Sequence, residues 1–453
     1  MKKIIALYAL LAAVILTSGC KKFVEGYDVS PNDPLDVNLE VLLTGTQVAT
    51  FSNYTGNLAR LPAVLMNQLA GRQFQFEDFQ QYVIRESAID NEFQQLYNGG
   101  MINAEVLAEK AGDNNKYYRG IARILKVMNL GLATDMWGDV PNSQALKGLV
   151  GETAFSPVYD TQENILRDIQ STLDLAIQDL SSDEASNFKV PGADDLIFGG
   201  DPVKWRNAAR ILKARYYNRL SKRDAAGSAT SALTALDAAY ADGLAGSADD
   251  LMAYSGEAAN EWNQWYAFEQ QRAGYITMNQ FFLDLLAGDP RLPLYASANA
   301  GGGFDDQQPI GPYSGDFDSP LPLVTYFEAR FIEAEAAFRA GNKDRAATAY
   351  NAAVTANLTK LGVADPVFLA LKASETALTI SLEKIMTQKY VAMFTQPEVW
   401  ADWRRTNIPA LTPNPDGEVA SIPRRLLTAQ SERLYNTNAV LVTDILKPVW
   451  WDE

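Results

Sequence analysis

The sequence predicts a mainly α-helical protein, in which tetratricopeptide-like helical hairpins form a superhelical scaffold beside a less regular, loop-rich lobe. Two observations lead to this prediction. Apolar residues recur at three- and four-residue steps in segment after segment, as they do on the buried face of an amphipathic helix. This periodicity largely fails between about residues 242 and 326, where aromatic residues, glycines and prolines are frequent. We therefore expect the lobe to interrupt the scaffold there.

The clearest helical hairpin covers residues 321–358. Gly341 separates its two helices, because glycine adopts a left-handed conformation without a Cβ clash, and Asn342 or Asp344 can cap the second helix. The apolar stripes of the two helices consist of Phe327, Phe331, Ala334 and Phe338, followed by Ala347, Tyr350, Val354 and Leu358. The charged residues expected to point away from the first stripe are Glu328, Arg330, Glu335 and Arg339. Since one hairpin cannot bury its stripes alone, similar neighbours should pack beside it.

Further helices are expected along the chain, because apolar residues again occur in helical spacing. They begin at Asn38 and then cover residues 57–69, 91–111, 117–136, 160–180 and part of 199–224, followed by 380–394 and 400–405. Large aromatic residues on such stripes usually belong to the core, which is the place expected for Trp137, Trp205, Trp400 and Trp403. The basic residues of segment 199–224 should be solvated or ion-paired: Arg206, Arg210, Lys213 and Arg215.

Residues 72–82, RQFQFEDFQQY, do not show a helical stripe. Phe74, Phe76 and Phe79 could form a short strand or an exposed aromatic loop, although core packing is the commoner fate of such residues.

The first residues of the chain, MKKIIALYALLAAVILTSGC, are typical of a bacterial lipoprotein signal. The apolar run from Ile4 to Leu16 is too short for a comfortable membrane-spanning helix, and Cys20, the single cysteine, stands where the lipid would be attached. We therefore expect residues 1–19 to be a signal peptide and residues 20–37 a lipidated tether. An ordinary secretory signal with a chance cysteine is the alternative.

Residues 38–453 are expected to form a single domain, with the loop-rich lobe inside it. No linker rich in Pro, Ser or Gly separates two halves, and 47% hydrophobic residues supply a large core. The formal net charge is -16 and no basic run occurs, which argues against nucleic acid as a partner.

The chain contains no histidine, which removes histidine-based triads, metal sites and general bases. Two carboxylates at a suitable separation would suffice for a glycosidase, so a surface glycosidase is the enzyme alternative. Asp305, Asp306, Asp316 and Asp318 could bind a hard cation such as calcium, but their spacing lacks the EF-hand pattern and a solvated loop is the simpler interpretation. No cofactor or metal site is expected.

The best candidates for ligand binding lie in the segment EWNQWYAFEQQ. Trp262 and Trp265 are three residues apart and Tyr266 follows, so one helical turn would present a contiguous aromatic face, with Asn263 and Gln264 between the tryptophans. An aromatic plane with amides beside it suits a sugar ring, which has an apolar C–H face and a rim of hydroxyls. Weaker candidates for the same site are Tyr54, Tyr275 and Tyr313. The alternative is that Trp262 and Trp265 fill a core gap.

Several segments in the same order resemble the SusD/RagB family of outer-membrane nutrient-binding lipoproteins of Bacteroidetes, especially its second SusD-like branch. Besides the lipoprotein start, the resemblance is carried by TDMWGDVPNSQAL (134–146), YDTQENILRDIQSTLDLAI (159–177), GDPVKWRNAARILKAR (200–215), GDPRLPLYA (288–296), EARFIEAEAAFRAG (328–341), QKYVAMFTQPEVWADWRRTNIP (388–409) and IPRRLLTAQSERLYN (422–436). It covers nearly the whole chain.

The resemblance implies a mostly helical SusD-like body with tetratricopeptide-like hairpins and a less regular lobe that carries the ligand site. It also implies a lipid-anchored protein, exposed at the surface of the outer membrane, that binds an oligosaccharide without catalysis and hands it to a SusC-like TonB-dependent transporter. The ligand could instead be an oligopeptide. A purely protein-binding adaptor is a further alternative, because helical hairpins of this kind also bind proteins.

Overall fold

The computed structural model describes residues 37–148 and 155–453. The predicted signal peptide, Cys20 and nearly all of the predicted tether lie outside these described residues. In the two described ranges, no helix combines the length and the apolar character needed to cross a bilayer.

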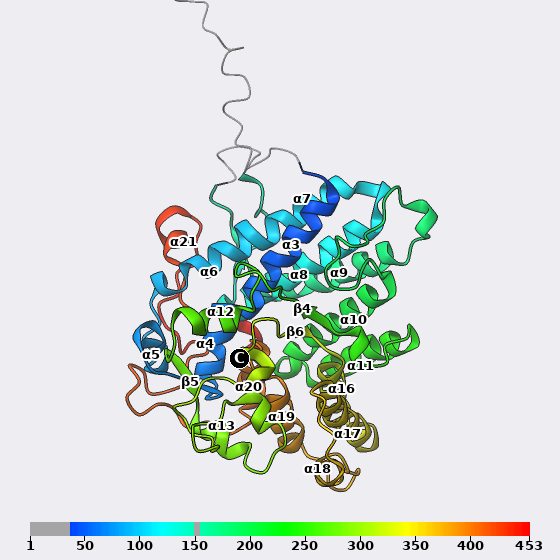
Figure 1. Cartoon of the computed structure of the whole chain (residues 1–453). Helices are drawn as coiled ribbons and strands as arrows, with labels where there is room; N and C mark the ends of the chain where they lie inside the picture. Colours follow the sequence, from blue (N-terminus) through cyan, green and yellow to red (C-terminus); the bar gives the residue numbers. More distant parts are fainter. Residues whose placement is uncertain (1–36, 149–154) are drawn as a thin grey trace, which may run out of the picture.

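The scaffold consists of helices that follow one another as antiparallel neighbours. The N-terminal helices are α3 (Leu39–Thr55), α4 (Asn57–Leu65), α5 (Phe74–Gln80), α6 (Asp90–Gln95) and α7 (Ile102–Ala111), with a π-helical turn at Leu96–Met101 before α7. The central hairpins are formed by α8 (Lys116–Trp137), α9 (Gln162–Leu180), α10 (Pro202–Arg219), α11 (Ala225–Ala241), α16 (Tyr326–Arg339) and α17 (Lys343–Lys360). Each of these six helices packs against the next, and Figure 1 shows them in sequence along one side of the molecule. The prediction of a mainly helical fold built from hairpins is confirmed.

The C-terminal part returns to the scaffold and then becomes irregular. It comprises α18 (Pro366–Lys372), α19 (Leu382–Ala392), α20 (Glu398–Thr406) and α21 (Gln430–Tyr435). Helices α19 and α20 lie beside α16 and α4 respectively, so they close the core between the central hairpins and the N-terminal helices. The four tryptophans expected in the core are all buried there: Trp137, Trp205, Trp400 and Trp403.

The hairpin α16–α17 has the boundary that its sequence predicts. Gly341 has a left-handed φ of 79°, and the side chain of Asn342 caps α17 by accepting a hydrogen bond from the backbone N–H of Arg345. The hairpin begins later than expected, however. Leu321–Val324 form strand β6 rather than helix, because Pro322 lacks the N–H that a helix needs and the segment pairs with β4 (Leu251–Ala253) instead.

Two of the charged residues that lie off the apolar stripe of α16 are buried among other helices. Glu328 and Glu335 are only 0% and 1% exposed, because α16 packs against α10, α11, α17 and α19 and so has little free surface. Each carboxylate is hydrogen-bonded to an arginine of another helix, Glu328 to Arg215 at 2.6 Å and Glu335 to Arg405 at 2.5 Å. The four basic residues singled out in this segment are ion-paired, one of the two states expected for them; Lys213 and Arg215 are buried, and Arg206 and Arg210 are partly exposed.

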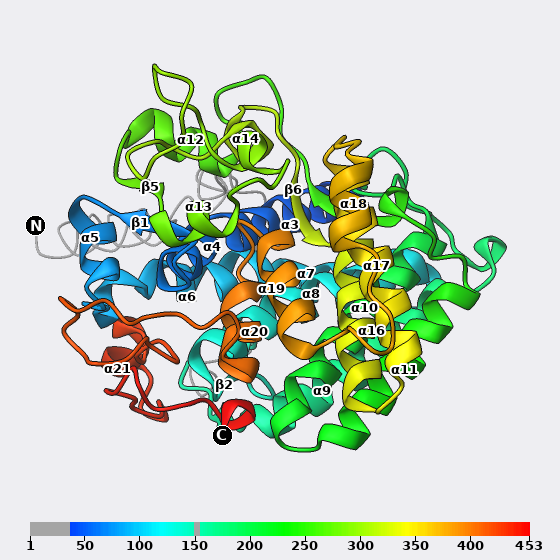
Figure 2. The same ribbon diagram turned by 90° about the horizontal axis from the view of Figure 1, so that it is seen from below.

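The loop-rich lobe contains only short elements. Besides β4 and β6 they are α12 (Gln264–Gln271), β5 (Ile276–Met278), α13 (Gln280–Leu285), α14 (Leu292–Tyr295) and α15 (Pro312–Gly315). Strand β5 pairs antiparallel with β1 (Leu69–Gly71), which joins the lobe to the chain after α4; a third small sheet pairs β2 (Val140–Pro141) with β3 (Tyr159–Asp160). Figure 2 shows α12, α13, α14 and β5 gathered on one side of α3 and α4.

Residues 72–82 form neither a strand nor a loop, because most of the segment is the short helix α5. Phe76 and Phe79 are three residues apart, share one face of this helix and are buried. Phe74 lies off that face and is 67% exposed. The segment therefore divides its phenylalanines between the core and the surface of the molecule.

Candidate ligand-binding site

The predicted ligand segment is organised by the N-cap of α12. The side chain of Asn263 accepts hydrogen bonds from the backbone N–H groups of Trp265 and Tyr266 at 2.7 and 3.2 Å, and it donates one to the carbonyl of Ser319 at 2.7 Å. Asn263 is buried. Its amide is thus occupied in starting the helix and in holding the chain near Ser319, and it is not free to bind a ligand as predicted.

Trp262 and Trp265 do not form the contiguous aromatic face that their spacing suggested. The helix begins at Gln264, so Trp262 precedes it and the spacing rule for helical neighbours does not apply. Trp265 is only 2% exposed and packs in the core, with the guanidinium of Arg60 5.8 Å from its ring. Trp262 remains partly exposed and contacts Tyr266 edge to face, with ring centroids 5.1 Å apart. Trp265 is therefore a core residue, as the alternative expected of both tryptophans, whereas Trp262 stays partly exposed.

The three tyrosines predicted as weaker ligand candidates also differ in burial. Tyr54 is 4% exposed, its hydroxyl donates to the carbonyl of Met128 at 2.9 Å, and burial raises its pKa to about 12. It is a core residue. Tyr313 packs beside Tyr295, with ring centroids 5.4 Å apart, and its buried hydroxyl has no hydrogen-bond partner among residues 37–148 and 155–453. Tyr275 is partly exposed on the surface of the lobe and is the only one of the three that faces Phe74.

Phe74 and Tyr275 form an exposed aromatic pair, which we call the aromatic platform. Their rings are stacked, with centroids 4.9 Å apart and an angle of 24° between the planes. The platform rests on the core, because Tyr275 contacts Phe268 edge to face and Phe268 contacts the buried Phe76. Tyr275 immediately precedes β5 and Phe74 begins α5, shortly after β1, so the β1–β5 pairing brings the two rings together.

The backbone of Phe74 is strained, which distinguishes it from an ordinary surface phenylalanine. Its φ is 51°, in the left-handed region, where a bulky residue costs on the order of 1–3 kcal/mol. The chain is tightly folded at this point, since a Cβ on Gly71 would lie 1.7 Å from the carbonyl oxygen of Phe76. Strain of this kind persists where the surrounding structure over-determines it, often at ligand-binding sites.

Polar groups surround the aromatic platform. Arg72 donates to the hydroxyl of Thr277 at 2.8 Å and forms an ion pair of 2.6 Å with Asp306. The hydrogen bonds from Gln307 and Arg72 hold the pKa of Asp306 below its ordinary value. Arg272 is exposed, lies 5.6 Å from the ring of Phe268 and forms no ion pair within residues 37–148 and 155–453. The platform thus combines an apolar face with hydrogen-bond donors at its edge.

The sequence did contain a signal for Phe74. In a short helix, Phe76 and Phe79 fall on one face and Phe74 falls away from it, so helical phasing alone would have set Phe74 apart as the exposed phenylalanine.

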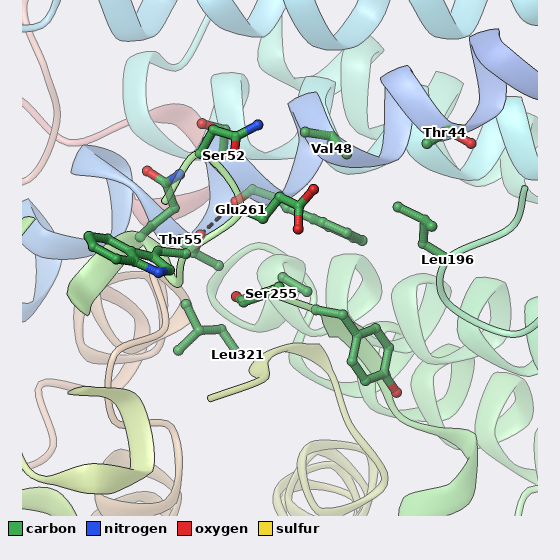
Figure 3. Close-up of a pocket in the computed structure, with 15 residues that line it drawn as sticks. Thr44, Val48, Ser52, Thr55, Leu196, Ser255, Glu261 and Leu321 are labelled. Atoms are coloured by element: carbon green, nitrogen blue, oxygen red, sulfur yellow. Dashed lines mark hydrogen bonds between the residues drawn. The ribbon is translucent and has the colours of Figure 1, made fainter. Parts of the chain in front are cut away.

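A pocket of about 510 Å³ lies at the other end of α12, between α3 and the chain that follows β4 (Figure 3). We call it the α3 pocket. Two predicted ligand residues, Trp262 and Gln264, line it together with Tyr254 and Glu261. Thr44, Val48, Phe51, Ser52 and Thr55 of α3 supply its opposite wall.

The acidic residues of the lobe do not gather into a cation site. Asp305 accepts hydrogen bonds from Asn299 and from the backbone of Gln307, and Asp306 is paired with Arg72. In the part of the chain that the structure describes, no group of three or more acidic, histidine or cysteine side chains could hold a metal ion.

Comparison with known proteins gives one family and many similar folds. A protein family described as starch-binding and associating with the outer membrane matches residues 31–427. A solved chitin-binding protein is 23% identical, with a TM-score of 0.75 over 92% of this chain and 100% of that one. A chitin-binding SusD homolog from Flavobacterium johnsoniae is 22% identical, with a TM-score of 0.74 over 91% and 98%. A SusD/RagB family protein from Bacteroides thetaiotaomicron is 21% identical, with a TM-score of 0.70 over 92% and 99%. No protein of curated function matches the sequence significantly.

Proposed function

Because this chain belongs to the SusD-like family, whose description is starch binding in association with the outer membrane, we propose that it binds a nutrient oligosaccharide at the cell surface. In this proposal it passes the ligand to a SusC-like TonB-dependent transporter for import and catalyses no reaction itself. Glycan rather than peptide binding is supported by two similar structures that are chitin-binding proteins. The absence of histidine from the chain also fits binding better than catalysis.

The observation that carries this proposal is the exposed, strained aromatic platform of Phe74 and Tyr275. A sugar ring can lie on it with its C–H face against the aromatic rings. Gln73 precedes Phe74 in the chain and donates to the carbonyl of Gly274, and Arg272 lies 5.6 Å from the ring of Phe268 that supports Tyr275, so these two side chains are proposed to meet hydroxyls at the edge. Aromatic side chains dominate binding energy at such sites because they bury a large area at low entropic cost. Trp262, Gln264 and Tyr266, at the opposite end of α12, are proposed as further ligand contacts.

The test is the affinity of Phe74 variants for starch and chitin oligomers, measured by isothermal titration calorimetry. We expect Phe74→Ala to weaken binding by about 2 kcal/mol, roughly 30-fold, with little change in melting temperature because the ring is exposed. Phe74→Gly should weaken binding equally and melt no earlier than Phe74→Ala, since glycine adopts a positive φ without strain.

A matched control is Phe188→Ala, because Phe188 is 85% exposed in a loop before α10. Within the described residues, its ring makes no contact with either ring of the aromatic platform. It should leave glycan affinity unchanged. The proposal would be wrong if Phe74→Ala bound every tested glycan as tightly as the unaltered protein. Binding of peptides in place of glycans would favour the oligopeptide alternative, and release of reducing sugar by the purified protein would favour a glycosidase.

We also propose the SusC-like transporter as the stable protein partner, in contact with a broad surface of the helical scaffold. Specific interfaces of this kind bury roughly 1,200–2,000 Å² or more, which a body with several exposed helices can provide. Purification of the tagged protein from detergent-solubilised outer membrane should bring down a large β-barrel protein. Repeated recovery of the protein alone would contradict this partner.

A further inference from the structure

The α3 pocket is enclosed enough to hold one small ligand unit. Its volume of about 510 Å³ lies within the range of small-molecule sites. Its apolar surface comes from Val48, Phe51, Leu196, Ala253 and Leu321. These residues belong to α3, to a loop before α10 and to the paired strands β4 and β6, so the walls are anchored in three separate parts of the fold.

Several polar side chains of the pocket have no hydrogen-bond partner in the part of the chain that the structure describes. Ser52, Ser255, Asn260 and Gln264 form no side-chain hydrogen bond within the described residues, and neither does the hydroxyl of Tyr254. By contrast, the two threonines of the opposite wall are satisfied, since Thr44 donates to the carbonyl of Asp194 and Thr55 to that of Phe51. The free donors and acceptors are thus concentrated on the side of the pocket formed by the 254–264 segment and Ser52.

Glu261 places a negative charge among these groups. Figure 3 shows its carboxylate between Ser52 and Ser255, near the middle of the lining side chains. The backbone N–H of Gly256 donates to the carbonyl of Glu261 at 2.9 Å and folds the loop back on itself. Gly256 also leaves room for the carboxylate, because a Cβ there would lie 2.2 Å from its Oε2. This carboxylate takes part in no ion pair of the described chain, and none of the lining residues is Lys or Arg.

An unpaired carboxylate in a pocket selects among ligands by charge. An acidic sugar would be repelled, and a neutral sugar would remove water from the carboxylate without supplying an opposite charge. A protonated amine would pair with Glu261, and the partly exposed rings of Trp262 and Tyr254 would add cation–π attraction. The sugar hydroxyls would still meet the free side chains of Ser52, Ser255 and Gln264.

We infer that the α3 pocket binds a sugar unit that carries a protonated amine, with the amine against Glu261 and the ring beside Trp262. This inference rests on the proposed glycan-binding function and names the kind of sugar unit that one part of the site takes. The pocket lies at the N-terminal end of α12, a helix of eight residues and hence about 12 Å long, and Tyr275 of the aromatic platform follows its C-terminal end by four residues. An oligosaccharide of a few units can therefore contact both.

The test compares a glucosamine oligomer with its N-acetylated counterpart of the same length, because the two differ in the charged amine. Calorimetry with the full chain should show tighter binding of the glucosamine oligomer, by about fivefold at low salt, and this preference should shrink as salt is added. Glu261→Gln keeps the shape of the side chain and should abolish the preference. Trp262→Ala should weaken binding of the glucosamine oligomer, and Phe74→Ala should weaken binding of both oligomers alike.

The inference is overturned if Glu261→Gln keeps the preference for the amine, or if the unaltered protein binds the N-acetylated oligomer as tightly as the glucosamine oligomer. No binding of the glucosamine oligomer would overturn it as well. Failure of the proposed function looks different, because Phe74→Ala would then leave both affinities unchanged whatever Glu261→Gln does. Equally effective displacement of the glucosamine oligomer by a simple alkylammonium ion would also overturn the inference, because the pocket would then bind organic cations without recognising a sugar.

Discussion

At the scale of single residues, the fold depends on charges that are buried in pairs. Glu335 of α16 accepts hydrogen bonds from Arg405 of α20 at 2.5 and 2.9 Å, and Arg405 also pairs with Asp402 at 2.5 Å. Both Glu335 and Arg405 are buried. Without Glu335, Arg405 would share Asp402 with Lys389, and Arg339 would lose the carboxylate that lies 3.5 Å from its Nε, so the buried cations would have too little negative charge beside them.

We therefore predict that Glu335→Gln lowers the free energy of unfolding by about 3–5 kcal/mol at neutral pH. Urea unfolding measures this change. Glu163→Gln is the matched control, because Glu163 pairs with Arg167 on the exposed surface of α9, and it should change stability by less than about 1 kcal/mol. Equal effects of the two substitutions would show that the buried pair has no special importance.

The same residue gives a pH dependence with a defined sign. Burial raises the pKa of Glu335, but attraction to Arg405 and the hydrogen bonds from it outweigh burial and leave the pKa below its ordinary value. A carboxyl whose pKa is depressed by folding stabilises the protein above its unfolded pKa and loses that contribution as pH falls. The stability difference between the unaltered protein and Glu335→Gln should accordingly shrink below about pH 4.5.

At the scale of elements, the sequence was informative wherever the signal is local. The stripes and the Gly341–Asn342 junction predict α16 and α17 because helix phase and capping depend on residues within a few positions. The sequence pattern does not predict helix α11, since its buried residues are mostly alanines, which make a weak stripe: Ala229, Ala232, Ala235, Leu236 and Ala239. The spacing of apolar residues predicts a helix only when one face is clearly more apolar than the other, and a face of alanines is only slightly apolar.

The candidate site was less predictable because it is assembled from distant segments. The aromatic platform depends on the register of strands β1 and β5, in which Leu69 pairs with Met278 and Gly71 with Ile276. The periodicity of neither segment predicts this register. The burial of Trp265 and the partial exposure of Trp262 were decided by where Asn263 starts the helix, which their spacing alone does not specify. The burial of Glu328 and Glu335 likewise depends on helices that reach α16 from elsewhere in the chain.

At the scale of the whole molecule, the protein combines an acidic, folded body with an N-terminal segment that the sequence predicts to carry lipid. Cleavage before Cys20 would remove Lys2 and Lys3, so that the formal net charge would change from -16 to -16 - 2 = -18. Such a charge keeps a body soluble and disfavours its direct adsorption to an anionic membrane surface. Membrane attachment should then depend on the lipid alone.

We predict that Cys20→Ala moves the protein from the membrane fraction to the soluble fraction without unfolding it. Each CH₂ of a buried lipid chain contributes about 0.8 kcal/mol, so loss of the acylated residue removes the attachment, while the described body from Val37 onward keeps all of its contacts. Cell fractionation with a high-salt wash measures the location, and circular dichroism should show an unchanged melting temperature. Ser18→Ala, which retains the cysteine, is the matched control and should stay with the membrane. Retention of the Cys20→Ala protein in the washed membrane would mean that something other than the lipid holds it there.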